Sequence, residues 1–305
     1  MGDIKFFRIE NDQAVELQGQ SLALEKSLQT LIEKNLETFL GIQFIASEYS
    51  TGKRHGGRID TLGLDENNSP VIIEYKRSLN ENVINQGLYY LDWLLDHKAE
   101  FELMILRRFG AEIADSIDWS SPRLLCIAGN FTKYDMHAVQ QINRNIELYQ
   151  YKHFQEQFFM LDLVNATTAQ PTLIEEQGTS TKTAGKTYRT VSDYINQASP
   201  ELTDWFEHLK AFMFNLGDDV QMNVLKYYIA FKRIKNFACV EVHPQTNTLL
   251  VNLKVDPSSI TLEPGFTRDV SNIGHYGTGN LEVRISNKED LEKAKLLISQ
   301  SYDIS

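Results

Sequence analysis

Two apolar runs separated by a polar turn constrain the fold of this chain most. RIDTLGL spans residues 58–64, PVIIEYK spans residues 70–76, and DENNSP between them is rich in the Asn, Ser and Pro of turns. The pattern predicts a β-hairpin. Three charged residues, Asp60, Glu74 and Lys76, nevertheless lie inside segments that are otherwise typical of buried strands.

The hairpin predicts where these charges lie. Because side chains alternate along a strand, Glu74 and Lys76 share one face, and the closed hairpin brings Asp60 beside Glu74. Two neighbouring carboxylates repel each other and are costly to bury, so a divalent cation, magnesium or manganese, is the simplest compensation. Lys76 would then orient a water or stabilise phosphate charge, as in metal-assisted phosphodiester hydrolysis. The plainer interpretation is an exposed edge strand, with Asp60 in a salt bridge.

These residues also follow the motif of a known family. Asp60 with Glu74-Tyr75-Lys76 resembles the D…(D/E)-x-K signature of the PD-(D/E)XK nuclease superfamily, and GRIDTLGLD…PVIIEYKR resembles the catalytic domain of the NucS/EndoMS endonucleases. NQGLYYLDWL supplies Gln86 and Tyr90, which match a Q-x-x-x-Y motif and share a helical face. The resemblance covers roughly residues 22–163.

The resemblance implies a fold and a set of roles. The fold is a restriction-endonuclease-like mixed sheet flanked by helices. Asp60 and Glu74 would bind Mg²⁺, with Mn²⁺ as the alternative metal, and Lys76 would assist the water or the transition state. Gln86 and Tyr90 would support the site or the substrate, although a polar helix face beside a packed ring explains them equally well.

The family also places a glutamate on its first helix. Here the helix is SLALEKSLQTLIEKNLETFLG, residues 21–41, whose leucines follow one helical stripe. Glu25 opens this helix and is the favoured candidate, Glu33 is the second and Glu37 the third. A solvated helix face is the plain alternative for all of them.

A basic, glycine-rich loop precedes Asp60. Lys53, Arg54 and Arg58 could meet backbone phosphates of a nucleic acid, and the glycines between them let a ligand approach the main chain. His55 is a weaker candidate for a general base. An ordinary solubilising surface loop explains the same residues.

Composition shifts along the chain predict its organisation. Residues 1–164 form the nuclease-like α/β domain, residues 165–187 form a linker rich in Thr, Gln, Gly and Ala, and residues 188–305 form a separate α+β domain. The last domain resembles a domain of unknown function that accompanies nuclease-like domains, and it would bind substrate or a protein partner.

The second domain has two features of interest. His275 and Tyr276 lie among glycines and could form a ligand-binding edge, and Lys232, Arg233 and Lys235 form a small basic cluster in the sequence. Strands are predicted at residues 224–234, 236–243, 246–255 and 281–286, with helices at residues 190–199, 201–217 and 288–302.

The composition limits the classes of protein to which this chain can belong. A chain of 305 residues with net charge −11 has room for two cores and is no polybasic nucleic-acid binder, although a local basic face with a divalent metal remains open. Cys126 and Cys239 lie in apolar runs, as buried thiols do. No signal peptide or membrane-spanning stretch is recognisable, so we expect a cytoplasmic protein.

Together these features favour a magnesium-dependent endonuclease that acts on DNA, in repair or in defence against foreign DNA. The NucS/EndoMS resemblance implies a homodimer, although no dimer interface is identifiable in the sequence. The alternative is a non-catalytic nucleic-acid or protein-binding module that keeps the nuclease fold. The intact charged residues of the hairpin favour the enzyme.

Overall fold

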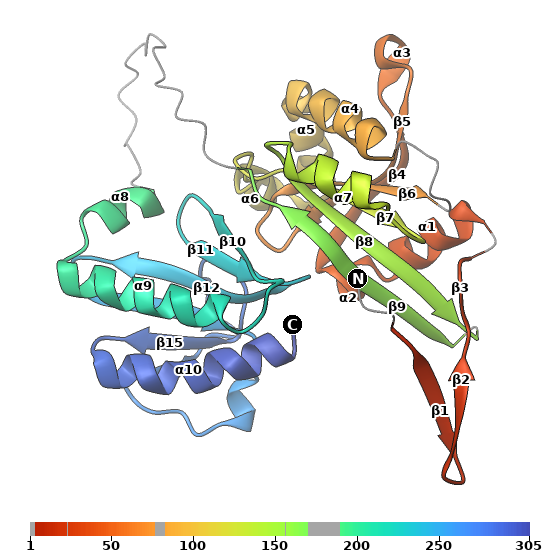
Figure 1. Ribbon diagram of the computed structural model, residues 1–305. Helices are drawn as coiled ribbons and strands as arrows, with labels where there is room; N and C mark the ends of the chain where they lie inside the picture. The colour runs from red at the N-terminus through yellow and green to blue at the C-terminus, as the bar shows by residue number, and fades with distance from the viewer. Residues whose placement is uncertain (1–3, 23, 77–82, 156, 170–189) are drawn as a thin grey trace. The chain divides into compact units, whose positions relative to one another are not determined.

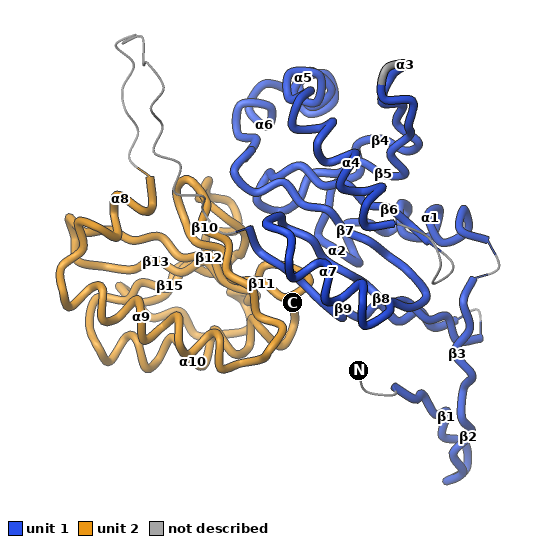
Figure 2. Tube along the Cα trace, turned by 45° about the horizontal axis from the view of Figure 1, so that its top comes forward, with its two compact units in different colours: residues 1–169 blue, residues 170–305 orange. Residues whose placement is uncertain are grey.

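The computed structural model describes residues 4–22, 24–76, 83–155, 157–169 and 190–305 (Figure 1). The chain divides into two compact units, residues 1–169 (unit 1) and residues 170–305 (unit 2), which are coloured separately in Figure 2. Strand β9 continues to Thr167, so the first residues of the predicted 165–187 linker belong to the sheet. Residues 170–187 of that linker lie outside the described residues.

Unit 1 is built on a seven-stranded mixed sheet with the order β3-β8-β7-β6-β5-β4, and β9 pairs with β8. Strands β4, β5 and β6 are antiparallel, and β6, β7 and β8 are parallel. The strands are β3 (Gly19–Gln20), β4 (Ile42–Ser50), β5 (Arg58–Asp65), β6 (Pro70–Lys76), β7 (Arg123–Ala128), β8 (Asn145–Phe154) and β9 (Phe158–Thr167).

The central hairpin confirms the sequence prediction. Strands β5 and β6 pair antiparallel, with Thr61 opposite Ile73 and Leu62 opposite Ile72. Asp65 closes the turn, because its Oδ1 accepts hydrogen bonds from the amides of Asn67 and Ser69 at 2.8 and 2.9 Å. The turn residues therefore set the register, as their composition indicates.

Helices lie on both faces of this sheet (Figure 1). Helix α4 packs on the face that carries Ile72 and Leu124, where its apolar side chains enter the main core of the unit. Helix α1 reaches the opposite face, where Glu33 contacts Thr61. The helices are α1 (Glu25–Lys34), α2 (Leu36–Leu40), α3 (Gly52–His55), α4 (Val83–Asp96), α5 (Lys98–Phe109), α6 (Ala111–Asp115) and α7 (Lys133–Gln140).

A separate two-stranded hairpin precedes the sheet, formed by β1 (Phe6–Glu10) and β2 (Gln13–Leu17). This hairpin is not among the strands predicted from the sequence. Phe6 ties it to the sheet by packing on Phe154 of β8, with ring centroids 4.8 Å apart.

Unit 2 is an antiparallel sheet with the order β10-β11-β12-β13-β15-β14, packed against helices. Its predicted class, a separate α+β domain, is confirmed. The elements are α8 (Val191–Asn196), α9 (Pro200–Phe214), β10 (Gln221–Val224), β11 (Ile229–Lys232), β12 (Asn236–His243), β13 (Thr248–Leu253), the short 3-10 helix η1 (Pro257–Ser259), β14 (Thr267–Asp269), β15 (Leu281–Ile285) and α10 (Lys288–Asp303).

One predicted strand of unit 2 is wrong. The run 224–234 is not continuous, because β10 ends at Val224 and a turn closed by the Leu225 amide on the Tyr228 carbonyl leads into β11. Apolar residues continue through the turn, at Leu225, Tyr227 and Tyr228, so the pattern alone does not reveal the reversal. Both cysteines are buried, as predicted.

Within the described ranges, none of the helices combines the length and the apolar character needed to cross a bilayer.

Candidate functional site

The site begins with Asp60 and Glu74, which face each other across β5 and β6. One step beyond the Thr61–Ile73 pair, the Asp60 amide donates to Glu74 Oε1 at 3.2 Å. The Tyr75 amide donates in return to Asp60 Oδ2 at 3.1 Å. Each carboxylate is therefore held by the backbone of the neighbouring strand, and both lie on one face of the sheet.

This pair is electrostatically costly. Glu74 is fully buried, and its Oε2 has no hydrogen-bond partner among the described residues. Burial raises the pKa of Asp60 to about 6, against the opposing effects of the Tyr75 amide and Lys76. Burial, followed by the charge of Asp60, raises the pKa of Glu74 to about 9. The pair therefore needs a proton or a cation to be stable at neutral pH.

Lys76 and Glu25 meet beside the carboxylate pair. Lys76 Nζ donates to Glu25 Oε1 at 3.4 Å, and Lys76 keeps only 14% of its side chain exposed. The structure thus brings the favoured glutamate of the first helix to the lysine of the motif.

The helix predicted over residues 21–41 is divided at Asn35 into α1 and α2, and the other two candidate glutamates, Glu33 on α1 and Glu37 on α2, lie elsewhere. Glu33 Oε1 accepts from Thr61 Oγ1 at 2.6 Å, and Thr61 faces away from Asp60 because side chains alternate along β5. Glu37 is exposed. Of the three candidates, only Glu25 contacts a residue of the motif.

A groove of about 620 Å³ gathers several predicted residues around Asp60, and we call it the Asp60 groove. It is lined by Glu48, Ser50, Gly52, Lys53, Gly56, Gly57, Arg58, Asp60, Gln86 and Tyr90. Lys53, Arg58, Gln86 and Tyr90 were all predicted from the sequence as site or substrate-binding residues. The groove therefore joins the basic loop, the first metal-ligand candidate and helix α4.

Tyr90 fixes the floor of this groove. Its Oη accepts a hydrogen bond from the Arg58 amide at 3.1 Å and lies 3.5 Å from Gln86 Nε2. The ring leaves no room for a side chain at position 57, because a Cβ on Gly57 would lie 2.5 Å from Tyr90 Cε1. The Q-x-x-x-Y pair thus holds the backbone just before Asp60.

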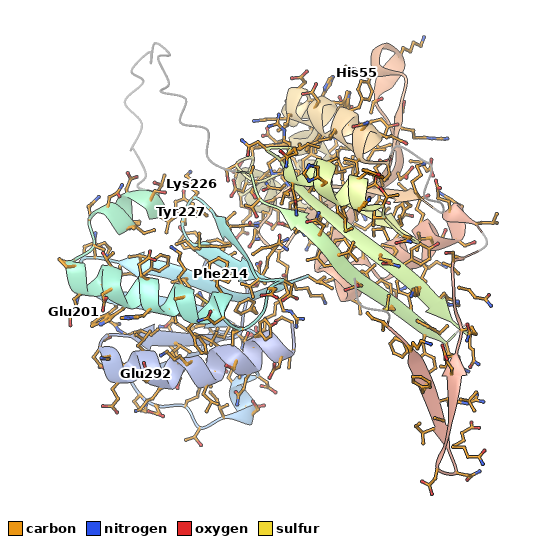
Figure 3. The ribbon with its side chains drawn as sticks, in the orientation of Figure 1. His55, Glu201, Phe214, Lys226, Tyr227 and Glu292 are labelled. Atoms are coloured by element: carbon orange, nitrogen blue, oxygen red, sulfur yellow. The ribbon has the colours of Figure 1, made fainter. Side chains whose placement is uncertain are left out.

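The rest of the basic loop forms α3. The side chain of Arg54 lies outside the described residues, so its predicted phosphate contact is not placed. His55, labelled in Figure 3, does not line the Asp60 groove. It lines a second cavity of about 440 Å³ together with Trp93 and His97. The structure therefore gives no support to His55 as the base of the Asp60 site.

Three residues of the site, Lys26, Gln29 and Glu48, are not predicted from the sequence. Glu48 Oε1 pairs with Lys26 Nζ at 2.8 Å, and Glu48 Oε2 pairs with Arg58 Nε at 2.9 Å. Gln29 Nε2 donates to the Asp60 carbonyl at 2.8 Å and is almost fully buried. The strand register that places Glu48 beside Asp60 depends on an irregularity between Phe44 and Ala46, for which the sequence carries no clear signal.

The residues of the site fit a hard divalent cation. The unpartnered Glu74 Oε2 beside Asp60 provides the oxygen ligands that such a cation prefers, and Mg²⁺ commonly binds through one or two carboxylates while keeping several waters. No cluster of three or more His, Cys, Asp or Glu side chains suited to a metal occurs in the described residues. The residues therefore fit a cation that takes its remaining ligands from water and substrate.

In unit 2 the glycine-rich loop leaves Tyr276 49% exposed, and the predicted basic cluster is not an open surface. Tyr276 stacks on Tyr227 with ring centroids 4.7 Å apart; Figure 3 labels Tyr227 in the β10–β11 turn. Lys232 is buried, and Arg233 pairs with Asp219 at 2.7 Å. Lys232 and Arg233 therefore do not form one basic surface, because Lys232 ends the buried strand β11 and Arg233 lies in the bend that follows it.

Comparisons with known proteins give one full-length relative. An uncharacterized protein of Haemophilus influenzae is 30% identical over 309 residues, which are 98% of this chain and 99% of that protein. Residues 191–305 match the family described as a domain of unknown function, DUF5655.

Two solved structures resemble part of the chain. A repair endonuclease from Pyrococcus abyssi is 20% identical with a TM-score of 0.29, over 43% of this chain and 48% of that one. The EndoMS–dsDNA2 complex is 19% identical with a TM-score of 0.25, over 43% and 47%. This chain thus spans about half the length of those proteins.

Proposed function

This chain belongs to one family with the uncharacterized Haemophilus influenzae protein, and we propose that it is a metal-dependent nuclease that hydrolyses phosphodiester bonds in DNA. The observation that carries the proposal is the buried carboxylate pair, Asp60 and Glu74, with Lys76 beside it. A domain with only a structural role gains nothing from burying Glu74 Oε2 without a partner. A site that has perturbed carboxylates next to a groove is a typical place for chemistry.

Each residue has a role in this proposal. Asp60 and Glu74 would hold Mg²⁺ or Mn²⁺, which when bound activates a water and stabilises charge on the phosphate. Lys76, positioned by Glu25 at 3.4 Å, would place a positive charge next to the reacting phosphate. Gln86 and Tyr90 would support the groove that accepts the DNA backbone.

The basic groups of the groove supply the contact with DNA. Lys53 and Arg58 line the same groove as Asp60, so a phosphate bound between them would bring the chain close to the carboxylates. This local arrangement agrees with a chain of net charge −11, because it needs only a small basic face. Unit 2 would recognise the substrate or a protein partner, and the biological setting would be DNA repair or defence against foreign DNA.

Cleavage assays test this function. Single-stranded, branched, mismatched and plain duplex DNA are incubated with the protein and Mg²⁺, Mn²⁺ or EDTA. We expect cleavage with a metal and none with EDTA. Asp60→Asn, Glu74→Gln and Lys76→Met should each abolish it, whereas Glu16→Gln, which removes a charge from the exposed Lys5–Glu16 pair, should not.

Two outcomes would contradict the proposal. Cleavage that persists in all three site variants would place the chemistry elsewhere. Binding of DNA without cleavage under every metal condition would identify a binding module that keeps the fold. Thermal unfolding with and without Mg²⁺ gives an independent readout, because a bound ion should raise the Tm of the wild type and not that of Glu74→Gln.

A further inference from the structure

Glu48 combines features that stability alone does not explain. It lies on β4, the edge strand next to β5, where Ser47 pairs with Thr61 and Tyr49 pairs with Ile59. Glu48 therefore sits opposite Asp60, and a row of carboxylates, Glu48, Asp60 and Glu74, crosses three neighbouring strands. Of these three, Glu48 is the one that no sequence motif indicates.

The backbone of Glu48 is in an unfavourable conformation. Its φ is +53°, in the left-handed region that side-chain-bearing residues avoid. Such conformations persist where surrounding contacts hold them, and they concentrate at functional sites. The Glu48 side chain makes two ion pairs, one to Lys26 and one to Arg58.

Both ion pairs are too exposed to offset the free-energy cost of the left-handed backbone at Glu48. Arg58 keeps 66% of its side chain exposed and Lys26 keeps 58%, and exposed pairs contribute little to folding. The contact to Arg58 is made through Nε at 2.9 Å, the inner nitrogen of the guanidinium. The paired side chain stays exposed, and a guanidinium offers several further N–H donors to phosphate oxygens.

We propose that Glu48 is a positioning residue that holds Arg58 on the rim of the Asp60 groove for contact with a DNA phosphate. The inference rests on the proposed nuclease function and deepens it. It attributes the orientation of a phosphate-binding arginine to the Glu48–Arg58 ion pair, which lies outside the motif. Both residues line the groove beside Asp60. Lys26 extends the arrangement, because its Nζ also donates to Gln29 Oε1 at 3.0 Å, and Gln29 in turn holds the Asp60 carbonyl.

The test is DNA binding measured without hydrolysis. Fluorescence anisotropy of a labelled duplex, with Ca²⁺ in place of Mg²⁺, is recorded at several salt concentrations for wild type, Glu48→Gln, Arg58→Ala and the double variant. We expect Glu48→Gln to weaken binding about three- to tenfold and to reduce the slope of log K against log salt by about 1. In the Arg58→Ala background the same change should have little further effect.

Two additional variants distinguish a positioning role of Glu48 from a purely structural one. Glu16→Gln loses an ion pair of similar exposure in the β1–β2 hairpin and should bind DNA as the wild type does. Glu48→Gly relieves the left-handed strain, so it should unfold at a temperature no lower than the wild type and still lose DNA affinity. In cleavage assays Glu48→Gln should raise KM with little change in kcat.

The outcomes separate this inference from the proposed function. If wild type binds and cleaves DNA and Glu48→Gln binds equally well or more tightly, Glu48 is a bystander or a competitor for Arg58, and the inference is wrong. An equal loss in the wild-type and Arg58→Ala backgrounds would also overturn it. If wild type neither binds nor cleaves DNA, the proposed function itself has failed.

Discussion

Asp60 and Glu74 are each held by the strand of the other, because the Asp60 amide donates to Glu74 and the amide after Glu74 donates to Asp60. The two bonds lock the carboxylates face to face across the hairpin. Their separation is therefore a property of the β-ladder and not of flexible side chains, which is the kind of rigid support that a catalytic site requires.

The stability of the metal-free protein should fall as the pH rises. Both carboxyls have pKa values raised by burial, to about 6 for Asp60 and about 9 for Glu74, so the folded state binds protons more tightly than the unfolded state. Their stabilising contribution is complete below the ordinary carboxyl range, near pH 4, and is lost as the pH rises through 6 and 9.

Denaturation in EDTA across this range measures the effect. The free energy of unfolding of the wild type should fall relative to the Asp60→Asn/Glu74→Gln double variant between about pH 4 and pH 9. A constant difference between the two proteins would show that the carboxylates are not coupled to folding. Added Mg²⁺ should reduce the loss, because a cation replaces the protons.

Gly57→Ala should destabilise unit 1 by about 1–3 kcal/mol, because the new methyl would overlap the Tyr90 ring at 2.5 Å and neither group can retreat freely. Urea unfolding measures the change. Gly57→Ala in a Tyr90→Leu background is the matched comparison and should cost less. An equal cost in both backgrounds would mean that the clash is not with Tyr90.

Arg123→Met should be the most destabilising of these changes, by about 3–5 kcal/mol. Arg123 is buried and donates to Glu147 through Nε and Nη2 at 2.8 Å each and to Asp65 through Nη1 at 2.9 Å. Its loss removes the positive charge that faces two buried carboxylates. Replacing Glu147 and Asp65 by Gln and Asn in the same protein should recover part of the stability, and a failure to recover any would contradict this account.

Glu25→Gln should lower the cleavage rate about tenfold, because it weakens the contact that holds Lys76 without removing the lysine. Glu33→Gln should affect stability more than cleavage, since Glu33 bonds to Thr61 on the other face of β5. Single-turnover cleavage and urea unfolding of both variants distinguish the two glutamates. The opposite ranking would assign the catalytic contact to Glu33.

The hairpin that carries the site is predictable because its signals are local. Alternation places Asp60 with Glu74, and the turn residues Asp65 to Ser69 set the register. The helical spacing of Gln86 and Tyr90 also places them correctly on α4. In each case a short-range pattern determines which side chains share a face.

The remaining residues depend on long-range or irregular structure. Glu48 comes beside Asp60 only through the irregularity in β4, and Gln29 is identified only by its bond to the Asp60 carbonyl. The reversal between Val224 and Ile229 falls inside an apolar run, so no change of pattern marks it. These features are decided by packing between segments far apart in the chain.

The central place of β6 has a consequence for motion. The strand is bonded to β5 on one side and β7 on the other, so its amides should exchange with solvent only when the whole sheet opens. Lys53 and Gly56 lie outside that ladder, in and just after the four-residue helix α3, and should exchange earlier. The two carboxylates should then keep their spacing while the segment that carries Lys53 opens and closes.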